Sequence, residues 1–364
     1  MTHHVHNRLS RRRFLQRTAA VGSALAALPL ASCAKAEPEP TASSDAAPAP
    51  AAAPVSSGDS AGQSRVVVIR HDALAAERGD LTPQRAAEFL NEAAKALAGE
   101  AKPADAWAQW FKPDDRVAVK VNCLGLSTRP AVAGGLVRAL GAIDLPASGA
   151  ILWDRTNREL QRAGYDLQAR GNGPRCFGTD ALSSRGHGGY SADVHSSGAT
   201  GSLISRIVTD EADALVSAAV LKDHNLAGLT GVMKNFFGAI HNPNKYHDNN
   251  CSPFIADAVA QKPIRSRLRL ALVDATRPQY QGGPASRPKW QWPYGALIVS
   301  TDPVAADAVG REILARKRES LGLKAFEAEV RPVRYLAAGE ARGLGTANLK
   351  RIEVVSIGKR WLDV

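Results

Sequence analysis

Short apolar runs alternate with helix-like patterns along the chain from residue 65 to its end. Mainly apolar runs predict buried strands at 66–69, 116–123, 149–153, 214–221, 268–273, 296–300 and 352–357. Between them, apolar residues spaced by three and four positions predict helices at 86–97, 130–140, 157–164, 254–260, 304–321 and 332–341. The alternation predicts an α/β domain whose sheet, mostly parallel or mixed, is flanked by helices.

No repeat and no change of composition divides residues 65–364. We therefore expect a single large domain, with room for two lobes. The segment 166–201 is rich in Gly, Ser and Arg and has no clear period, so a long functional loop and a small hairpin insertion both remain open.

The first 33 residues have the pattern of an export signal. Residues 10–16 read SRRRFLQ, which is typical of a twin-arginine signal peptide, and the apolar run 19–30 is too short for a permanent membrane anchor. The sequence LASC at 30–33 resembles a lipobox, which predicts lipidation of Cys33 and a membrane tether; a cleavage site with an incidental cysteine is the alternative. Residues 34–62, mostly Ala, Pro and Ser, are expected to be a disordered linker. The protein is thus predicted to be a lipoprotein of the periplasm or cell envelope.

The positive charge of the chain is concentrated at its start. The formal net charge is +11, and the first seventeen residues hold five arginines and no acid, which leaves +6 for the remainder. No Lys/Arg-rich block with interleaved aromatic residues is present, so nucleic acid is not expected as a partner.

The segment 213–251 gathers the residues best suited to chemistry. Its apolar run ends in Lys222, Asp223 and His224, and three of the six histidines beyond residue 6 lie within it. Polar residues at a strand end next to glycine-rich turns are where α/β proteins place ligands. The sequence therefore predicts a small-molecule or cofactor site here.

Two residues of this segment are candidates for catalysis. His224 suits acid–base chemistry or metal ligation, and a buried, hydrogen-bonded histidine is the alternative. Lys234 suits an ion pair with an anionic ligand or covalent attachment. We expect its cationic head to be exposed, so that Lys234→Ala removes the ligand with little loss of stability.

A phosphate-like cradle is the second candidate feature. The glycine spacing favours an anion or cofactor phosphate held by Lys234 and by backbone N–H groups, with tight packing as the alternative use of the glycines. The nucleotide P-loop pattern is absent, because the lysine is followed by asparagine. The predicted cofactor-binding residues are Lys120, Asn122, Gly228, Gly231, Lys234 and Asn235.

The third candidate feature is a metal site. His247 and Cys251 are four residues apart and can share one face of a helical turn, with Cys123 as a further ligand. An odd number of cysteines beyond Cys33 cannot pair completely, so a disulfide with one free thiol and a metal-bound thiolate both remain open. The C-x-x-C pattern is absent, which disfavours an iron–sulfur cluster built from local ligands.

Several segments together resemble the family catalogued as domain of unknown function 362. They are VKVN at 119–122, LKDH at 221–224, GLTGVMKNFFG at 228–238, IAD at 255–257 and DPVAAD at 302–307. The resemblance spans residues 65 to 321. It implies no settled activity, and the iron–sulfur modules that some members of the family carry are absent from this sequence.

The segment also resembles, locally and distantly, the nickel-pincer lactate racemase. His224, Lys234 and His247 match that family's strand-end histidine, cofactor-holding lysine and metal-binding histidine. The chain has no counterpart of the other catalytic histidine in a G-x-H-R setting. The likeness implies a metal ion or metal-containing cofactor rather than racemisation.

These observations give two functional hypotheses. The first is an exported, membrane-tethered protein that binds a metal or phosphorylated cofactor at 213–251 and carries out proton or redox chemistry on a small molecule. The second is a non-catalytic ligand- or metal-binding lipoprotein that serves a protein partner at the membrane.

Overall fold

Alternate side chains of the first strand, β1 (Ser64–Arg70), enter two separate hydrophobic cores. Val66 and Val68 belong to one core, while Val67 and Ile69 belong to the other. All four are at most 3% exposed. Successive side chains of a strand point to opposite faces, so the sheet is covered on both sides.

The computed structural model describes residues 63–76, 80–184, 187–329 and 331–364. Its other strands are β2 (Val117–Val121), β3 (Ala150–Trp153), β4 (Arg175–Cys176), β5 (His195–Ser197), β6 (Thr200–Ser202), β7 (Ala214–His224), β8 (Gly228–Thr230), β9 (Leu268–Gln279), β10 (Ala296–Ser300) and β11 (Ile352–Gly358). The helices are α1 (Pro83–Ala98), α2 (Pro103–Ala108), α3 (Pro130–Leu140), α4 (Asn157–Ala163), α5 (Phe254–Ala260), α6 (Lys262–Arg265), α7 (Pro303–Ser320) and α8 (Tyr335–Ala341).

Nine strands form one mixed sheet in the order β11-β1-β10-β9-β7-β2-β3-β4, with β8 paired to β7. The pairs β1–β11, β7–β9, β2–β7, β2–β3 and β3–β4 are parallel, while β1–β10, β9–β10 and β7–β8 are antiparallel. Since β2, β3 and β7 run in the same direction, their carboxyl ends lie at the same edge of the sheet.

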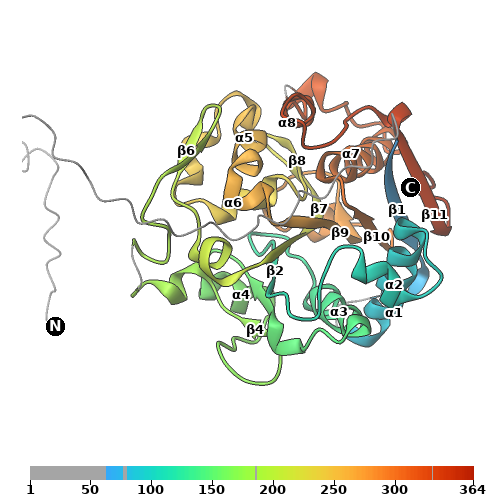
Figure 1. The fold of residues 1–364 in the computed structure, drawn as a ribbon. Helices are drawn as coiled ribbons and strands as arrows, with labels where there is room; N and C mark the ends of the chain where they lie inside the picture. The colour runs from blue at the N-terminus through green and yellow to red at the C-terminus, as the bar shows by residue number, and fades with distance from the viewer. Residues whose placement is uncertain (1–62, 77–79, 185–186, 330) are drawn as a thin grey trace, which may run out of the picture. The chain divides into compact units, whose positions relative to one another are not determined.

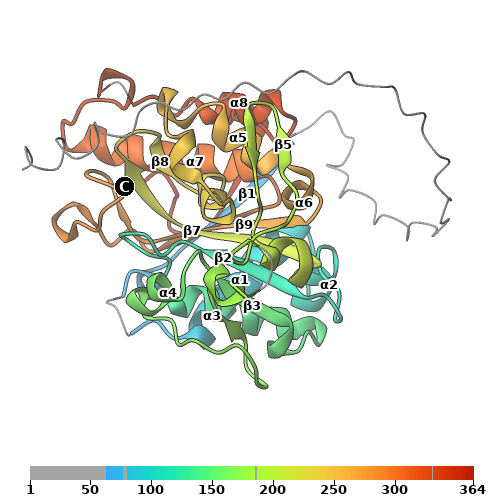
Figure 2. The ribbon, with the colours of Figure 1, turned by 90° about the vertical axis from the view of Figure 1, so that its left-hand side faces the viewer.

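The helices cover both faces of this sheet. Helices α1, α2 and α3 lie on one face, and α5, α7 and α8 lie on the other (Figures 1 and 2). Each face has its own core, with α1 and α3 packed together in the first. The predicted α/β fold, a mostly parallel mixed sheet flanked by helices, is confirmed.

Most predicted elements are present, and their boundaries follow the expected signals. Helix α1 begins after Thr82, whose side chain accepts a hydrogen bond from the N–H of Arg85. Helix α8 begins later than predicted, at Tyr335. In the segment without a period, β5 and β6 pair as a small antiparallel hairpin, which was one of the two open alternatives.

The main difference is at β7. The apolar pattern predicts an end at Leu221, whereas the strand continues through His224 and turns back into β8. The three added residues are polar but buried, because other parts of the chain supply their partners. Asp223 pairs with Arg331, for example.

The predicted twin-arginine signal, the linker and Cys33 lie outside the described residues. Within the described ranges, no helix is both long and apolar enough to cross a bilayer.

Candidate functional site

A cavity of about 140 Å³ lies at the edge of the sheet where β2, β3 and β7 end. The walls come from these three strand ends, from α4 and β8, and from two 3-10 helices, η7 (Lys234–Ala239) and η8 (Pro243–Tyr246). Its ionisable lining residues are Lys120, Asp154, Arg155, Glu159, Lys222, His224, Lys234 and His247. Ligand pockets usually measure about 300–1,000 Å³, so this cavity suits a small molecule or one end of a larger one.

One side of the cavity is built on a buried ion pair. The Lys120 Nζ lies 2.6 Å from the Asp154 Oδ1 and donates further hydrogen bonds to the Val121 carbonyl and the Asn235 Oδ1. Both charged side chains are buried. Because the charge of Lys120 is compensated within the protein, this lysine attracts an anionic ligand only weakly.

Lys222 faces the cavity from β7 and has oxygen partners that carry no charge. Its Nζ lies 2.8 Å from the Asn122 Oδ1, 2.5 Å from the Leu124 carbonyl and 2.6 Å from the Leu126 carbonyl. Burial, and then the nearby Lys234, lowers its pKa to about 7. Three acceptors match the three N–H groups of an ammonium, so this site holds the charged form in place without neutralising it.

His224 ends β7, and the structure fixes its tautomer. The Nδ1 receives hydrogen bonds from the backbone N–H groups of Leu226 and Ala227, at 3.1 and 3.2 Å. Two donors can meet only a lone pair, so the hydrogen of the neutral ring is on Nε2. Burial, and then Lys234, lowers the pKa of His224 to about 2, which keeps the ring neutral. The residue therefore offers a hydrogen-bond donor to the cavity.

Lys234 is buried, which corrects the expectation that its cationic head is exposed. The side chain begins η7 and is 8% accessible. Its Nζ lies 3.4 Å from the His247 Nε2 and 4.7 Å from the centre of the Phe237 ring. No carboxylate in the described part of the chain forms an ion pair with it. Burial lowers the pKa of Lys234 to about 8.

His247 has the opposite tautomer to His224. Its Nδ1 lies 2.9 Å from the Pro243 carbonyl, which can only accept a hydrogen bond. The Nδ1 therefore carries the hydrogen, and the Nε2 lone pair points toward Lys234. Burial, and then the Lys234 charge, lowers the pKa of His247. The two histidine rings stack with their centres 6.1 Å apart.

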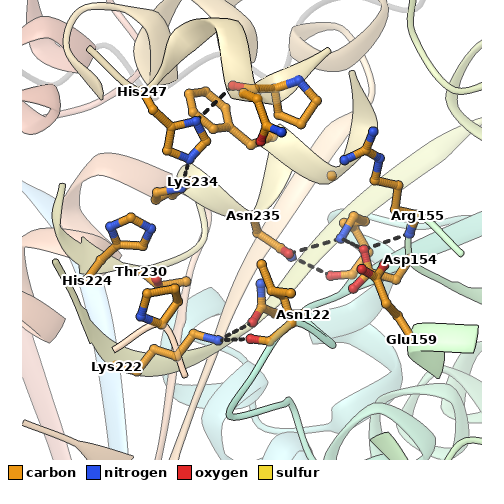
Figure 3. Close-up of a pocket in the computed structure, with 17 residues that line it drawn as sticks. Asn122, Asp154, Arg155, Glu159, Lys222, His224, Thr230, Lys234, Asn235 and His247 are labelled. Atoms are coloured by element: carbon orange, nitrogen blue, oxygen red, sulfur yellow. Dashed lines mark hydrogen bonds and ion pairs between the residues drawn. The ribbon is translucent and has the colours of Figure 1, made fainter. Parts of the chain in front are cut away.

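These groups occupy two sides of the cavity (Figure 3). Lys234, His224 and His247 lie on one side, and Asp154, Arg155 and Glu159 lie on the other. Asn235 lies between them. Its Nδ2 donates to the Lys120 carbonyl at 2.7 Å and to the Ser217 Oγ at 3.1 Å. The hydrogen bonds of Asn235 thus link η7 to β2 and β7, and its side chain also lines the cavity.

The two glycines predicted to hold a cofactor are packed against the protein itself. A side chain at Gly228, whose φ is +74°, would meet the Arg331 carbonyl. One at Gly231 would overlap the carboxylate of Asp307. That carboxylate accepts hydrogen bonds from the N–H groups of Val232 and Met233, at 2.7 and 3.1 Å. Neither glycine lines the cavity, so packing accounts for both.

The three predicted metal ligands are not brought together. Cys251 does not line the cavity, and its Sγ lies 3.8 Å from the backbone carbonyl of His247. Cys123 is buried in the core on the opposite face of the sheet, and its N–H donates to Asp154. Burial raises the pKa of both thiols. Among the described residues, no group of three His, Cys, Asp or Glu side chains could hold a metal ion.

The cavity joins six of the predicted residues, Lys120, Asn122, His224, Lys234, Asn235 and His247. Lys222 was not among the predicted site residues, although it directly follows a predicted strand. Asp154 and Arg155 were not predicted either, and they follow β3, the strand beside β2. Their position at parallel strand ends was the signal that could have identified them.

The chain was compared with known proteins and protein families. No curated protein matches it. A family model matches residues 117–312 and so includes every residue that lines the cavity. The match covers more than half of the chain, and the protein therefore belongs to the family described as Domain of unknown function (DUF362).

Proposed function

We propose that the cavity binds a small molecule with an anionic group. One observation supports this most directly: Lys222 and Lys234 face the same cavity, and neither forms an ion pair with a carboxylate of the described residues. Burial, and then the charge of Lys234, lowers the pKa of Lys222. A bound carboxylate or phosphate would compensate both charges at once.

The two histidines give this site a means to move a proton. His224 offers an N–H to the cavity, and His247 offers a lone pair. A molecule bound beside both can receive a hydrogen bond from one ring and lose a proton to the other. We propose proton transfer on the bound molecule as the chemistry of the site. Binding without turnover, in the service of a membrane partner, is the alternative.

A metal-containing cofactor is the second candidate ligand, and the geometry of His247 favours it. Metal-bound histidines usually donate their other ring N–H to a backbone carbonyl or a carboxylate, as His247 does to Pro243. A bare ion does not fit, because His224 has no free lone pair toward the cavity and the cysteines lie elsewhere. A cofactor that brings its own metal ligands needs only His247 and an anion contact at Lys234. Such a group would supply Lewis-acid or redox chemistry.

The binding proposal is tested with acetate, oxalate and inorganic phosphate in calorimetric titrations at low ionic strength. Loss of a charged hydrogen bond costs about 1.5–3 kcal/mol, so Lys234→Met should weaken anion binding by about tenfold or more. The matched control is Lys245→Met, which removes an exposed lysine of the same segment that does not line the cavity. A bound anion raises the pKa of Lys222 and Lys234, so the protein should take up protons from solution when the anion binds between about pH 7 and 9.

Two results would contradict the proposal. One is that no anion binds to the wild-type protein. The other is that Lys234→Met binds anions as tightly as Lys245→Met does. Metal analysis of the same preparations tests the second candidate: a metal that is present in wild type and lost in His247→Ala supports a metal-containing cofactor.

We also propose that the protein is exported through its twin-arginine signal and tethered to a membrane through Cys33. The support is the sequence of residues 1–33 alone. The site is then placed in the periplasm or cell envelope.

A further inference from the structure

Lys234 differs from the other lysines of the cavity in what surrounds its amine. Lys120 is bound by a carboxylate and two oxygens, and Lys222 is bound by three oxygens. The only hydrogen-bond partner of the Lys234 Nζ among the described residues is a ring nitrogen, and a Phe237 ring covers it. Nothing in this arrangement requires the ammonium form, because a free amine can still donate one N–H to the lone pair of this ring nitrogen.

The partner nitrogen can take a proton from this amine. The Pro243 carbonyl holds the hydrogen of His247 on Nδ1, so the Nε2 at 3.4 Å from Lys234 is a lone pair. The Lys234 side chain is buried, and no carboxylate among the described residues forms an ion pair with it. A buried lysine amine without a charged partner is suited to act as a nucleophile.

The remaining groups favour a particular kind of partner for this amine. The Nε2–H of His224 can donate to a carbonyl or hydroxyl oxygen in the cavity, which Lys234 also lines. Lys222, held by three oxygen atoms, adds a second amine to the same cavity. The volume of about 140 Å³ suits a small partner or one end of a larger one. A carbonyl group and an acid group on one small molecule would use all three features.

From this geometry we propose that Lys234 forms a Schiff base with the carbonyl carbon of a small oxo acid. The inference rests on the proposed function, because Lys222 and Lys234 must first attract the acid group. The amine lone pair attacks the carbonyl carbon, a C–N bond forms, and the carbonyl π bond breaks. His247 accepts the proton that leaves the nitrogen, and the oxygen takes up a proton to give a carbinolamine.

The second half of the step releases water. The C–O bond breaks after the hydroxyl takes up a proton, and the nitrogen lone pair closes a protonated C=N bond. His224 stabilises the oxygen through its N–H as the hydroxyl forms and leaves. The whole step converts amine, carbonyl compound and one proton into iminium and water, and it needs no oxidant or reductant.

Reductive trapping of the full chain tests the inference. The probes are glyoxylate and pyruvate, with acetaldehyde as a carbonyl compound that lacks the acid group, each with sodium cyanoborohydride. Peptide mass mapping should find the reduced adduct on Lys234, formed at least about tenfold faster than on any other lysine. Trapping should rise from pH 6 to pH 9 and should be slower with acetaldehyde.

Matched variants separate this chemistry from general lysine reactivity. Lys245→Arg removes an exposed lysine of the same segment and should leave the adduct unchanged. Lys234→Arg keeps the charge and should remove the adduct. If the larger arginine side chain perturbs folding, as judged by circular dichroism, Lys234→Met serves instead.

The outcomes distinguish the two levels of the proposal. Anion binding without an adduct on Lys234, or equal trapping on Lys234 and Lys245, overturns the Schiff base and leaves the proposed function standing. Absence of both anion binding and adduct in wild type overturns both. An adduct that is lost in Lys234→Arg and kept in Lys245→Arg supports both.

Discussion

Lys234 is a buried cation that forms no ion pair with a carboxylate of the described residues, and this has a consequence for stability. Burial lowers its pKa from 10.5 to about 8. Between these two values the unfolded chain binds more protons than the folded one, so stability rises with pH across this window. Below pH 8 the full cost of burying the charge is present, about 3 kcal/mol for a pKa change of this size.

Lys234→Met should therefore stabilise the protein at pH 7, by up to about 3 kcal/mol, since methionine fills similar space without a charge. The gain should shrink as pH rises from about 8 and should be lost near pH 10.5. Urea unfolding of wild type and variant across pH 6–10.5 measures it. A gain that does not change with pH, or a loss of stability at pH 7, contradicts the burial argument.

Lys222→Met is the matched comparison, because Lys222 is also buried and its pKa is also lowered. Its removal leaves the Asn122 Oδ1 and two backbone carbonyls without their donor. The hydrogen bonds lost at these partly buried oxygens offset the gain from removing a buried charge, so Lys222→Met should stabilise the protein at pH 7 less than Lys234→Met does.

At the residue scale, the sequence could identify candidates but not their environment. A site could be predicted because two histidines and a lysine follow a strand closely in the sequence, at His224, Lys234 and His247. The histidine tautomers depend on the Pro243 carbonyl and on the N–H groups after His224, and the burial of Lys234 depends on Phe237. Such contacts are set by three-dimensional packing and cannot be predicted from the spacing of residues in the sequence.

At the element scale, the turn before Lys234 is held by a helix that lies far away in the sequence. The Asp307 carboxylate of α7 accepts the N–H groups of Val232 and Met233, and the Tyr335 hydroxyl donates to it at 3.1 Å. Gly231 leaves the space that this carboxylate fills. Asp307 is therefore a positioning residue that fixes where η7 and its lysine begin.

Asp307→Asn should both destabilise the protein and weaken anion binding. An amide presents an N–H₂ group to one of the donors, so one buried backbone N–H is left without its acceptor, at a cost of about 1–3 kcal/mol. The matched control is Asp302→Asn. Asp302 is half-buried and caps α7 by accepting from the N–H of Ala305, and its hydrogen bonds go to residues outside the turn.

Urea unfolding and calorimetric titration with oxalate measure the two effects. Both variants should lose stability, but only Asp307→Asn should bind oxalate more weakly per folded molecule. Equal loss of oxalate binding in the two variants would show that Asp307 acts through general stability and does not position Lys234.

The element boundaries show why the fold was predictable while parts of the sheet were not. Helices α3 and α5 and strand β10 match their predicted ranges, because apolar periodicity and proline define them locally. Strands β7 and β9 both continue past the end of their apolar runs. The residues added to β7 are polar and buried, and Asp223 among them pairs with the distant Arg331. Those added to β9 include the buried polar residues Asp274, Thr276 and Gln279. The periodicity of apolar residues in the sequence predicts only the burial of apolar side chains. A strand end with buried polar residues is therefore predicted as a loop.

At the scale of the whole molecule, the described residues form one α/β domain with the site at a sheet edge. In our proposal, residues 1–33 determine where that domain works. The proposed twin-arginine signal has two separable parts. The translocase reads the arginine pair, whereas attachment of lipid requires Cys33. Changes in one part should therefore leave the function of the other intact.

Replacement of Arg11 and Arg12 by lysine should retain the precursor in the cytoplasm, because lysine keeps the charge but not the recognised pair. Cys33→Ala should leave export intact and release the domain from the membrane fraction, since a protein without acyl chains has no hydrophobic anchor. Cell fractionation and immunoblotting of both variants measure export and tethering.

Arg8→Lys is the matched control, because Arg8 lies outside the SRRRFLQ motif. Export of the double lysine variant at the level of this control would exclude the twin-arginine route. Membrane retention of Cys33→Ala would exclude the lipid anchor and point to a bound partner as the tether.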